Sequence, residues 1–366
     1  MISNRSLAQG CAVLLFLILL SVRPPFLASQ QPPSAGETDA YVLAVVREVQ
    51  DRYPEDADSY FNAGQAHGRA GRYKDAIEAF QKGLSINPDR PDIYKALATL
   101  AIRCDREEEA AGFLQEVVTR FPAAPNFNER LGLALLHLGR LDEALAAFQR
   151  EKEISGSNPF IACYMGEIHL QKKELDRAQP LLEEAVRLGP EIPQPYYSLA
   201  QVYLKQGNRR RAGELLQTFR ALKSKAEEEA DRAPKPSDAQ NLNRSKAAAH
   251  RDAGRVYLLH NELAKAEDHF CKAVAFDPED VSCCAQLADM FLRGKRNYPE
   301  ALELTRTLTK LAPTAAHYYL LSWACYENHL LDEAMEACRK TVELEPDNPV
   351  YQKRYQQFLQ ARSGPK

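Results

Sequence analysis

One phrase occurs twice in the chain and limits what the chain can fold into. GRYKDAIEAFQK runs from Gly71 to Lys82, and GRLDEALAAFQR runs from Gly139 to Arg150. Both begin with glycine and arginine, contain two alanines and a phenylalanine followed by glutamine, and end on a basic residue. Recurrence at a fixed distance indicates stacked repeats, so this reading has to be tested over the whole chain first.

The distance between the two phrases equals two periods of about 34 residues, and this period holds along most of the chain. One slot of each repeat holds a small residue: Gly64, Ala98, Gly132, Gly166, Ala200, Gly254, Ala288 and Ser322. A second slot always holds alanine: Ala76, Ala110, Ala144, Ala178, Ala212, Ala266, Ala301 and Ala334. The step from Ala200 to Gly254 is longer than one period, so extra residues lie between the fifth and sixth of eight repeats.

Each repeat holds two apolar segments at helical spacing, split by a polar turn such as RAGRY and often followed by proline. Two antiparallel helices approach closely only where a side chain is very small. We therefore expect Gly64 to face Ala76 across the first pair, with Phe80 filling the space beside them. One pair cannot bury its apolar face alone, but stacked pairs form a continuous core. The sequence predicts an all-α fold, an α-solenoid of about eight helix-turn-helix repeats forming a superhelix.

The pattern of small, bulky and proline slots resembles the tetratricopeptide repeat (TPR) family, whose repeats of about 34 residues are helix-turn-helix pairs. The resemblance covers residues 57–348. It places the first five repeats in 57–234, the last with an extended helix, and the other three in 247–348. Residues 41–56 resemble the second helix of a degenerate leading repeat, and residues 349–366 resemble a polar C-terminal capping helix.

The extra residues between the fifth and sixth repeats read as two parts. RALKSKAEEEADRA is strongly helix-forming, which predicts that the second helix of the fifth repeat runs long. PKPSDAQNLNRS follows, and its proline and polar residues predict a loop or hinge at 235–246. The segment is a hinge between the two blocks of repeats, a projecting arm or a tolerated surface insertion.

The N-terminus looks like a targeting segment. An uncharged, mostly apolar run extends from Cys11 to Val22, shorter than the roughly 20 residues that a membrane span needs. This run predicts a signal peptide over 1–29, with a flexible tether over 30–40; the alternative is an uncleaved membrane anchor. With the repeats, this start indicates an exported bacterial type of TPR protein, periplasmic or secreted, that touches a membrane only through an uncleaved leader.

The residues that carry chemistry form no recognisable catalytic motif. The chain has no HExxH, no GxSxG and no phosphate-binding glycine loop, and its net charge of −3 gives no basic field for nucleic acid. We therefore expect no enzyme activity, no cofactor and no metal. Cys325 and Cys338 fall on interior slots and form a possible disulfide, with buried free thiols as the alternative. The adjacent Cys283 and Cys284 are a further candidate for metal binding or disulfide exchange.

The family resemblance implies that the first helices line a concave groove that binds a protein or peptide. The slots that face outward from these helices supply the candidate partner-binding residues: Phe61, Gln65, Arg69, Lys95, Arg103, His137, Tyr197, Lys205, Arg251, Arg255, Arg293, Tyr319 and Trp323. Arginine and aromatic residues are frequent binding hot spots. One hypothesis is a groove for an acidic, partly apolar segment, with Tyr319 and Trp323 as an exposed aromatic pair. The other is an ordinary solvated face.

These observations predict a protein-protein interaction scaffold or adaptor that serves assembly of a complex in the cell envelope. The main alternative is a non-catalytic regulatory or substrate-presenting subunit of an enzyme complex. Two further alternatives are saccharide binding and catalysis by the chain itself. The sequence does not identify the partner.

Overall fold

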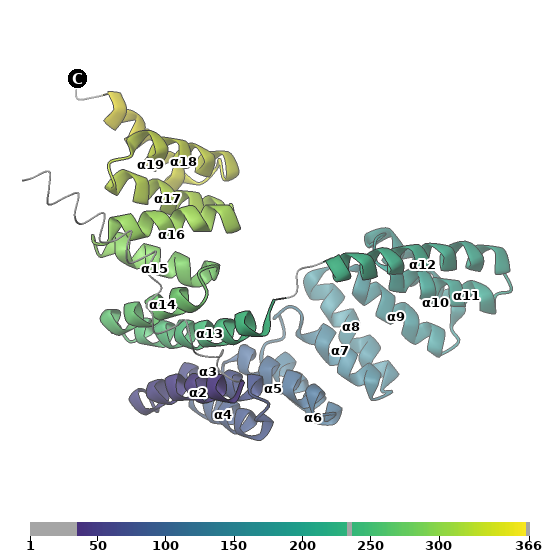
Figure 1. The fold of residues 1–366 in the computed structure, drawn as a ribbon. Coiled ribbons are helices and arrows are strands. Elements are labelled where there is room, and N and C mark those ends of the chain that lie inside the picture. Colours follow the sequence, from purple (N-terminus) through teal and green to yellow (C-terminus); the bar gives the residue numbers. More distant parts are fainter. Residues whose placement is uncertain (1–34, 233–235, 364–366) are drawn as a thin grey trace, which may run out of the picture. The chain divides into compact units, whose positions relative to one another are not determined.

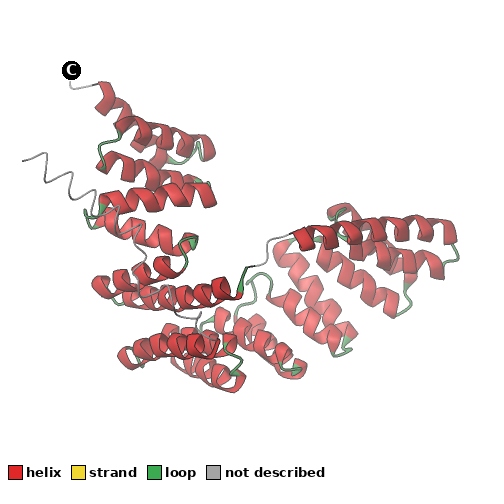
Figure 2. Ribbon diagram, viewed as in Figure 1, coloured by secondary structure: helices red, strands yellow, loops and turns green. Residues whose placement is uncertain are grey.

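The computed structural model describes residues 35–232 and 236–363, and every regular element in these ranges is an α-helix (Figures 1 and 2). The first helices of eight successive repeats are α3 (Ala57–Arg69), α5 (Pro91–Arg103), α7 (Phe127–His137), α9 (Pro159–Gln171), α11 (Pro193–Lys205), α13 (Asp238–Leu259), α15 (Val281–Arg293) and α17 (Ala315–Glu327). The second helices are α4 (Tyr73–Ile86), α6 (Glu107–Arg120), α8 (Leu141–Ser155), α10 (Leu175–Leu188), α12 (Arg209–Arg232), α14 (Leu263–Phe276), α16 (Tyr298–Leu311) and α18 (Leu331–Leu344). Helices α2 (Ala35–Arg52) and α19 (Pro349–Ser363) stand before and after the pairs. The predicted all-α solenoid is confirmed.

The contacts divide the chain into two compact bodies. The N-terminal body contains Val45–Pro236 and Asp252–Ala266. The C-terminal body contains the described residues of Met1–Ala44, Ser237–Arg251 and Glu267–Lys366. The division therefore passes through helices α2, α13 and α14, and it also falls between α12 and α13.

The turn inside each repeat uses the same backbone conformation. The second residue after each first helix has a positive φ: Gly71, Asp105, Gly139, Lys173, Gly207, Asn261, Lys295 and His329. The turn of the seventh repeat has a second such residue, Asn297. Glycine adopts this left-handed conformation without strain, whereas other residues adopt it at a cost. Most of these turns lack the glycine, so the packing of the two helices, rather than turn chemistry alone, holds the shape.

The close approach of paired helices depends on the small slot. A side chain at Gly64 would place its Cβ 2.5 Å from the Phe80 ring, and Gly132 meets Phe148 in the same way, at 2.8 Å. The bulky residue therefore fills the space beside the small slot, as expected. In the fourth repeat the backbone oxygen of Ala178, at the slot of Ala76, lies 3.4 Å from where a Cβ on Gly166 would be.

Two predicted boundaries are wrong, and the described helices show why. Helix α2 begins at Ala35, so residues 35–40 of the predicted tether are helical. Helix α12 is long, as predicted, and reaches Arg232, but residues 238–246 of the predicted loop are the first turns of α13. The Ser237 hydroxyl accepts from the Gln240 amide at 3.2 Å, while the Gln240 side chain accepts from the Ser237 amide at 2.8 Å. This reciprocal capping box starts α13 early.

In the N-terminal body, α2 packs against residues that lie far later in the chain. The Tyr53 ring stacks on His260 with 3.9 Å between ring centroids, and the Tyr257 hydroxyl donates to Glu48 at 3.0 Å. Tyr53 and Arg52 both donate to Glu262, at 2.6 and 2.8 Å, and these bonds lower the pKa of Glu262 to about 2. Helix α2 therefore packs against part of the sixth repeat. The periodicity of the sequence did not indicate this contact.

In the C-terminal body, α19 covers the last repeat. Phe358 is only 2% exposed, and its ring lies 5.2 Å from that of Tyr326 in α17. Arg354 sits over both rings. A helix in this place shields the apolar end of the stack, which a repeat array needs for solubility.

The predicted signal peptide and the first residues of the predicted tether lie outside the described residues. Among those described, no helix combines the length and the apolar character needed to cross a membrane.

Candidate partner-binding surface

A cavity of 370 Å³ lies between the first helices of the first two repeats, and we call it the α3/α5 pocket. Five predicted groove residues line it: Phe61, Gln65, Arg69, Lys95 and Arg103. They come together because the first three sit on one face of α3 and the other two on the matching face of α5, one repeat later. All belong to the N-terminal body.

The floor of the pocket is apolar and shaped by missing side chains. Gly64 and Gly68 line it from α3, and the buried Phe80 ring from α4 lies beneath Gly64. A Cβ on Gly68 would already touch the Leu100 side chain at 3.4 Å. The half-buried Phe61 forms an apolar wall. Apolar side chains of a bound segment would be removed from water here, which is the main favourable term in association.

Three basic side chains surround this floor. Lys95 is exposed, and its ammonium has no partner among the described residues. Arg69 donates to Gln65 at 3.0 Å and lies 3.5 Å from Asp252. Arg103 donates to the Tyr73 hydroxyl at 3.1 Å and stands over that ring at 5.3 Å. The Gln65 and Tyr73 contacts are to neutral groups, so Arg103 has no ion pair among the described residues, whereas Arg69 shares its charge with Asp252.

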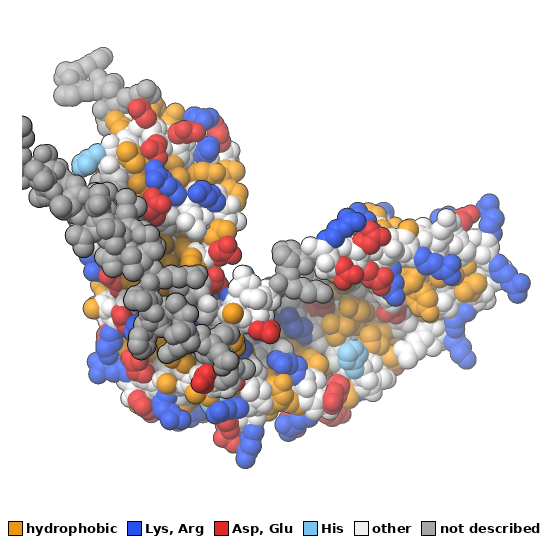
Figure 3. All heavy atoms as spheres, in the orientation of Figure 1, with side chains coloured by type: hydrophobic (Ala, Val, Ile, Leu, Met, Phe, Trp, Pro, Cys, Tyr) orange, Lys and Arg blue, Asp and Glu red, His pale blue; other side chains and the backbone are white. Residues whose placement is uncertain are grey.

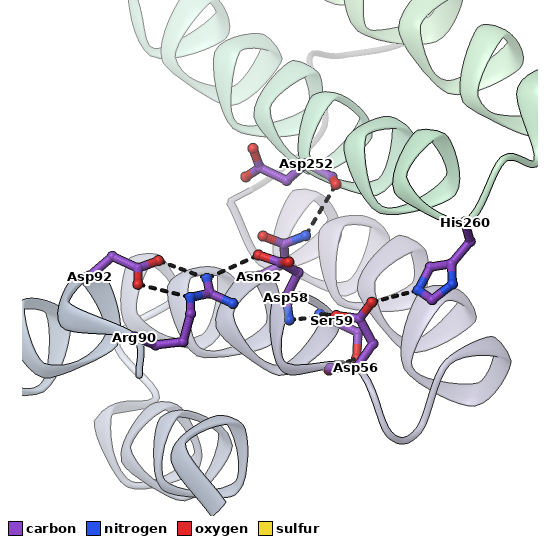
Figure 4. A network of polar contacts seen from close by, with 8 residues as sticks. All are labelled: Asp56, Asp58, Ser59, Asn62, Arg90, Asp92, Asp252 and His260. Atoms are coloured by element: carbon purple, nitrogen blue, oxygen red, sulfur yellow. Dashed lines mark hydrogen bonds and ion pairs between the residues drawn. The ribbon is translucent and has the colours of Figure 1, made fainter. Parts of the chain in front are cut away.

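The one carboxylate that lines the pocket is already engaged (Figure 4). Arg90 binds Asp92 through two hydrogen bonds of 2.9 and 2.7 Å and also pairs with Asp58 at 2.9 Å. Burial alone would raise the pKa of Asp92, but the bonds and charge of Arg90 lower it below its ordinary value. The pocket therefore keeps a net positive character.

Figure 4 also shows how the surrounding helices are fixed. Asn62 donates to the backbone carbonyl of Asp252 at 3.1 Å, and His260 pairs with Asp56 at 2.5 Å. Asp56 is the N-cap of α3 and accepts from the amides of Asp58 and Ser59. The Asn62 and His260 contacts tie the start of α3 to α13 and to the turn after it, so the α3 wall of the pocket is supported from behind.

The other candidates in the N-terminal body do not line this pocket. His137, Lys205 and Arg255 are exposed. Tyr197 is 42% exposed, and its ring packs against Phe219 at 5.3 Å. These residues are available on the surface, but no described contact joins them to the α3/α5 pocket.

The candidates in the C-terminal body are held by neighbours. Arg251 pairs with Asp280 at 2.8 Å, and Arg293 pairs with Asp289 at 2.6 Å. Tyr319 packs on Tyr351 of α19 with 5.3 Å between ring centroids.

The fourth candidate there, Trp323, donates its indole N–H to Glu327 at 3.1 Å. Tyr319 and Trp323 are both partly buried, so the expected exposed aromatic pair is wrong. The reason is that α19 and a carboxylate one turn along α17 take up these side chains.

The cysteine expectations also need correction. Cys325 and Cys338 are buried free thiols, so the possible disulfide is not formed; the Cys338 sulfur points toward the Tyr351 carbonyl, 3.9 Å away. Burial raises the pKa of both thiols to about 11. Cys283 and Cys284 are buried as well, which leaves their sulfurs inaccessible for exchange. Within the described residues, no group of three or more His, Cys, Asp or Glu side chains is placed to hold a metal ion.

Sequence reasoning missed the residues that set the charge of the pocket. Arg90 and Asp92 flank Pro91 at the start of α5, and Arg-Pro-Asp at a helix start was a usable signal for a local ion pair. On the face drawn in Figure 3, basic and acidic side chains are interspersed over the surface. The basic lining of the α3/α5 pocket belongs to a chain whose net charge is −3.

Family models described as tetratricopeptide repeat match residues 43–91, 69–127, 165–234 and 292–349. The chain belongs to the tetratricopeptide repeat family. Membership of this family suggests a protein-protein interaction scaffold, and TPR scaffolds are generally non-catalytic.

Curated relatives share only part of their length with this TPR chain. Cellulose synthase operon protein C of Pseudomonas fluorescens is 26% identical over 230 residues, which cover 54% of this chain and 18% of the relative. Tetratricopeptide repeat protein 21A of Mus musculus is 30% identical over 105 residues, covering 28% of this chain and 8% of the relative. The chain thus spans less than a fifth of either relative.

Solved TPR structures resemble it at low identity. A crystal structure of MamA protein has a TM-score of 0.44 at 19% identity, covering 49% of this chain and 98% of that one. The crystal structure of yeast Tom70 has a TM-score of 0.40 at 18% identity, covering 89% of this chain and 64% of that one.

Proposed function

We propose that the protein is an adaptor whose α3/α5 pocket binds an acidic, partly apolar segment of a partner protein. The observation that carries this proposal is the combination of an apolar floor with three basic side chains around it. The lining carboxylate, Asp92, is bound by Arg90 and does not cancel their charge. Apolar side chains of the segment would occupy the space above Gly64 and Gly68, and its carboxylates would face the basic side chains Arg69, Lys95 and Arg103.

The test is binding of a fluorescently labelled peptide with alternating glutamate and leucine residues, followed by anisotropy with the full chain. A peptide with lysine in place of glutamate serves as the charge control. We expect the acidic peptide to bind and the affinity to fall as salt is added, because exposed charges are screened.

Arg69→Glu combined with Arg103→Glu should weaken binding about tenfold or more, since two favourable contacts become repulsive. Arg293→Glu is the matched control, because Arg293 is already paired with Asp289 outside the pocket. Circular dichroism checks that all variants keep their helices. Equal loss in both variants, or tighter binding of the lysine peptide, would contradict the assignment.

A second candidate function is a non-catalytic subunit of an enzyme complex. The observation that favours it is the match to a relative whose name places it in a cellulose synthase operon. A partner enzyme whose rate changes on adding the purified chain would favour this function over passive scaffolding. An unchanged rate in a stable complex would favour the adaptor.

We also propose that the protein acts outside the cytoplasm, in assembly of a complex of the bacterial cell envelope. The apolar run Cys11–Val22 after Arg5 supports export as a periplasmic or secreted protein, with an uncleaved anchor as the alternative. N-terminal sequencing of the protein from its source cells tests this: a start near residue 30 supports cleavage, and an intact Met1 in a membrane pellet supports the anchor.

A further inference from the structure

The third and fifth repeats contain the same groove in two sizes. In the third repeat it lies among α6, α7 and α8, has a volume of 490 Å³, and is lined by residues that include Gln115, Asn128, Leu131, Leu135, Ala147 and Arg150. In the fifth repeat it lies among α10, α11 and α12, has a volume of 290 Å³, and is lined at the matching slots by Glu183, Tyr196, Leu199, Tyr203, Leu215 and Thr218. The members of each matching pair are separated by two repeat periods. Both grooves belong to the N-terminal body.

The difference in volume follows from side-chain size. Asn128 stands where the fifth repeat has Tyr196, and Ala147 stands where it has Leu215. Leu135 likewise replaces Tyr203. Leu131 and Leu199 are the same residue at matching slots, so the two grooves have the same apolar base. Above this base, the third repeat has open space where the larger side chains of Tyr196 and Leu215 lie in the fifth repeat.

A tyrosine occupies the Asn128 slot in four of the eight repeats, as Tyr60, Tyr94, Tyr196 and Tyr318. The remaining repeats hold Ala162, His250 and Cys284 there. Tyr94 is only 2% exposed and donates its hydroxyl to Glu116 at 2.6 Å; burial and that carboxylate raise the pKa of Tyr94 to about 12.

The second helix supplies a group that contacts this tyrosine. Glu116 takes this role for Tyr94, and Lys340, at the matching slot of the eighth repeat, stands over the Tyr318 ring at 5.4 Å. In the fifth repeat the Tyr196 hydroxyl donates to the Pro190 carbonyl at 2.9 Å instead. In the fourth repeat the slot holds the buried Ala162, and there Glu184 is bound by Lys152 and Ser157.

In the third repeat two polar groups of this slot are open to the groove. Asn128 lines the groove, and its amide makes no hydrogen bond to a described residue although its polar atoms are not enclosed. Arg150, at the slot of Glu116 and Lys340, is exposed, lines the same groove and has no ion pair or hydrogen bond among the described residues. Glu143, which also lines the groove, is already bound by Arg140 at 2.6 and 2.7 Å. The Asn128 amide and the Arg150 guanidinium are therefore available to a ligand that lies in the groove.

We propose that the groove of the third repeat binds a tyrosine side chain supplied by a protein partner. The ring would lie against Leu131, Leu135 and Ala147, in the place that Tyr196 fills in the fifth repeat. The phenol oxygen would bond to the Asn128 amide, and the Arg150 guanidinium would cover the ring face as Lys340 covers Tyr318. This surface is separate from the α3/α5 pocket, so the two sites can be tested independently.

The first probe is p-cresol, which is the tyrosine side chain alone, titrated into the full chain and followed by saturation-transfer NMR. Such a small ligand is expected to bind with a dissociation constant in the millimolar range. Toluene serves as the matched probe without the hydroxyl, and the peptide Gly-Tyr-Gly tests whether a tyrosine within a chain is accepted. We expect p-cresol and the peptide to bind and toluene to bind at least several-fold more weakly.

Two variants fill the groove from within. Asn128→Tyr restores the residue of the other repeats, and Ala147→Leu restores the residue of the fifth; each should abolish binding of p-cresol. Asn128→Tyr should also raise the melting temperature, and if it fails to fold, Ala147→Leu carries the test. Lys225→Ala, at an exposed position of α12 outside both sites, should leave p-cresol binding unchanged.

Three results would overturn the proposal. The first is absence of saturable p-cresol binding to the unmodified chain, or binding that survives both filling variants. The second is equal binding of toluene, which would remove the tyrosine assignment. The third is binding of p-cresol without binding of the peptide, which would make the groove a site for small phenols rather than for a protein partner.

Discussion

Arginines at equivalent slots of the first helices behave differently in the two bodies. In the N-terminal body Arg103 borders a cavity without an ion pair among the described residues, and Arg69 pairs with Asp252 of another helix at 3.5 Å, whereas Arg293 in the C-terminal body is bound by Asp289 of its own helix at 2.6 Å. The residue one helical turn earlier explains the difference. At i−4 from the arginine stand Gln65 and Thr99 in the first two helices, but Asp289 in the other. The position of an arginine in the repeat fixes where its side chain points. The residue four positions before it decides whether the guanidinium is already paired within its own helix or is available to a partner.

The largest effect should come from filling the floor of the α3/α5 pocket. Gly64→Val would push a side chain into the Phe80 ring, since even a Cβ there lies 2.5 Å from it. We expect a loss of about 3 kcal/mol in unfolding free energy, measured by chemical denaturation, and loss of the acidic peptide from the pocket.

Ser322→Val, at the same slot of the last repeat, is the comparison for this variant. Ser322 already carries a Cβ and is fully buried, so the change should cost about 1 kcal/mol. An equal cost in the two variants would show that the close approach at Gly64 is not special.

A smaller effect should follow from giving the first helices the acids that the C-terminal body has. Gln65→Asp combined with Thr99→Asp would pair Arg69 and Arg103 as Asp289 pairs Arg293. We expect the acidic peptide to bind about five- to tenfold more weakly in the anisotropy titration. Gln171→Asp, an exposed change on α9, controls for added negative charge, and a comparable loss there would refute the local explanation.

The smallest effect should come from the reverse change. Asp289→Asn removes the partner of Arg293, and the freed guanidinium should add a second, weak site for the acidic peptide on the C-terminal body, which raises the apparent affinity about twofold at low salt. The change Asp176→Asn, at an exposed acid on α10, alters net charge equally and should have no such effect. Unchanged affinity in Asp289→Asn would mean that this face lacks the apolar contacts that the α3/α5 pocket supplies.

Periodicity was sufficient to predict the helix pairs and the face that the groove residues share. The small residue that recurs in every repeat fixes which side of each first helix turns inward, so Phe61, Gln65 and Arg69 could be placed on one face from the sequence. Contacts outside the period could not be predicted in this way. Arg251 meets Asp280 of the following repeat, and Tyr319 meets a ring on the capping helix. Both contacts depend on how neighbouring helices pack in space rather than on the repeat pattern.

The wrong boundary at 235–246 arose because one local signal in the sequence was given more weight than another. Proline and polar residues suggested a loop at 235–246, but Ser237 and Gln240 form a capping box, a signature that can be read from sequence. The pocket at Asn128 could also be predicted from sequence, because asparagine stands in a slot that holds tyrosine in four other repeats. The volume of the pocket could not be predicted, because it depends on how Leu135 and Ala147, which are smaller than their counterparts in the fifth repeat, pack around it.

The packing of α2 has a consequence for synthesis on the ribosome. Most contacts in a repeat array are local, so such chains can fold as they emerge. Glu262, which binds Tyr53 and Arg52, is made only when the sixth repeat is translated. At ordinary translation rates of about 5–20 residues per second, the end of α2 waits roughly 10–40 s for that partner. During that interval the apolar side of α2, including the otherwise buried Val45, Val46 and Val49, is open to chaperones and to neighbouring nascent chains.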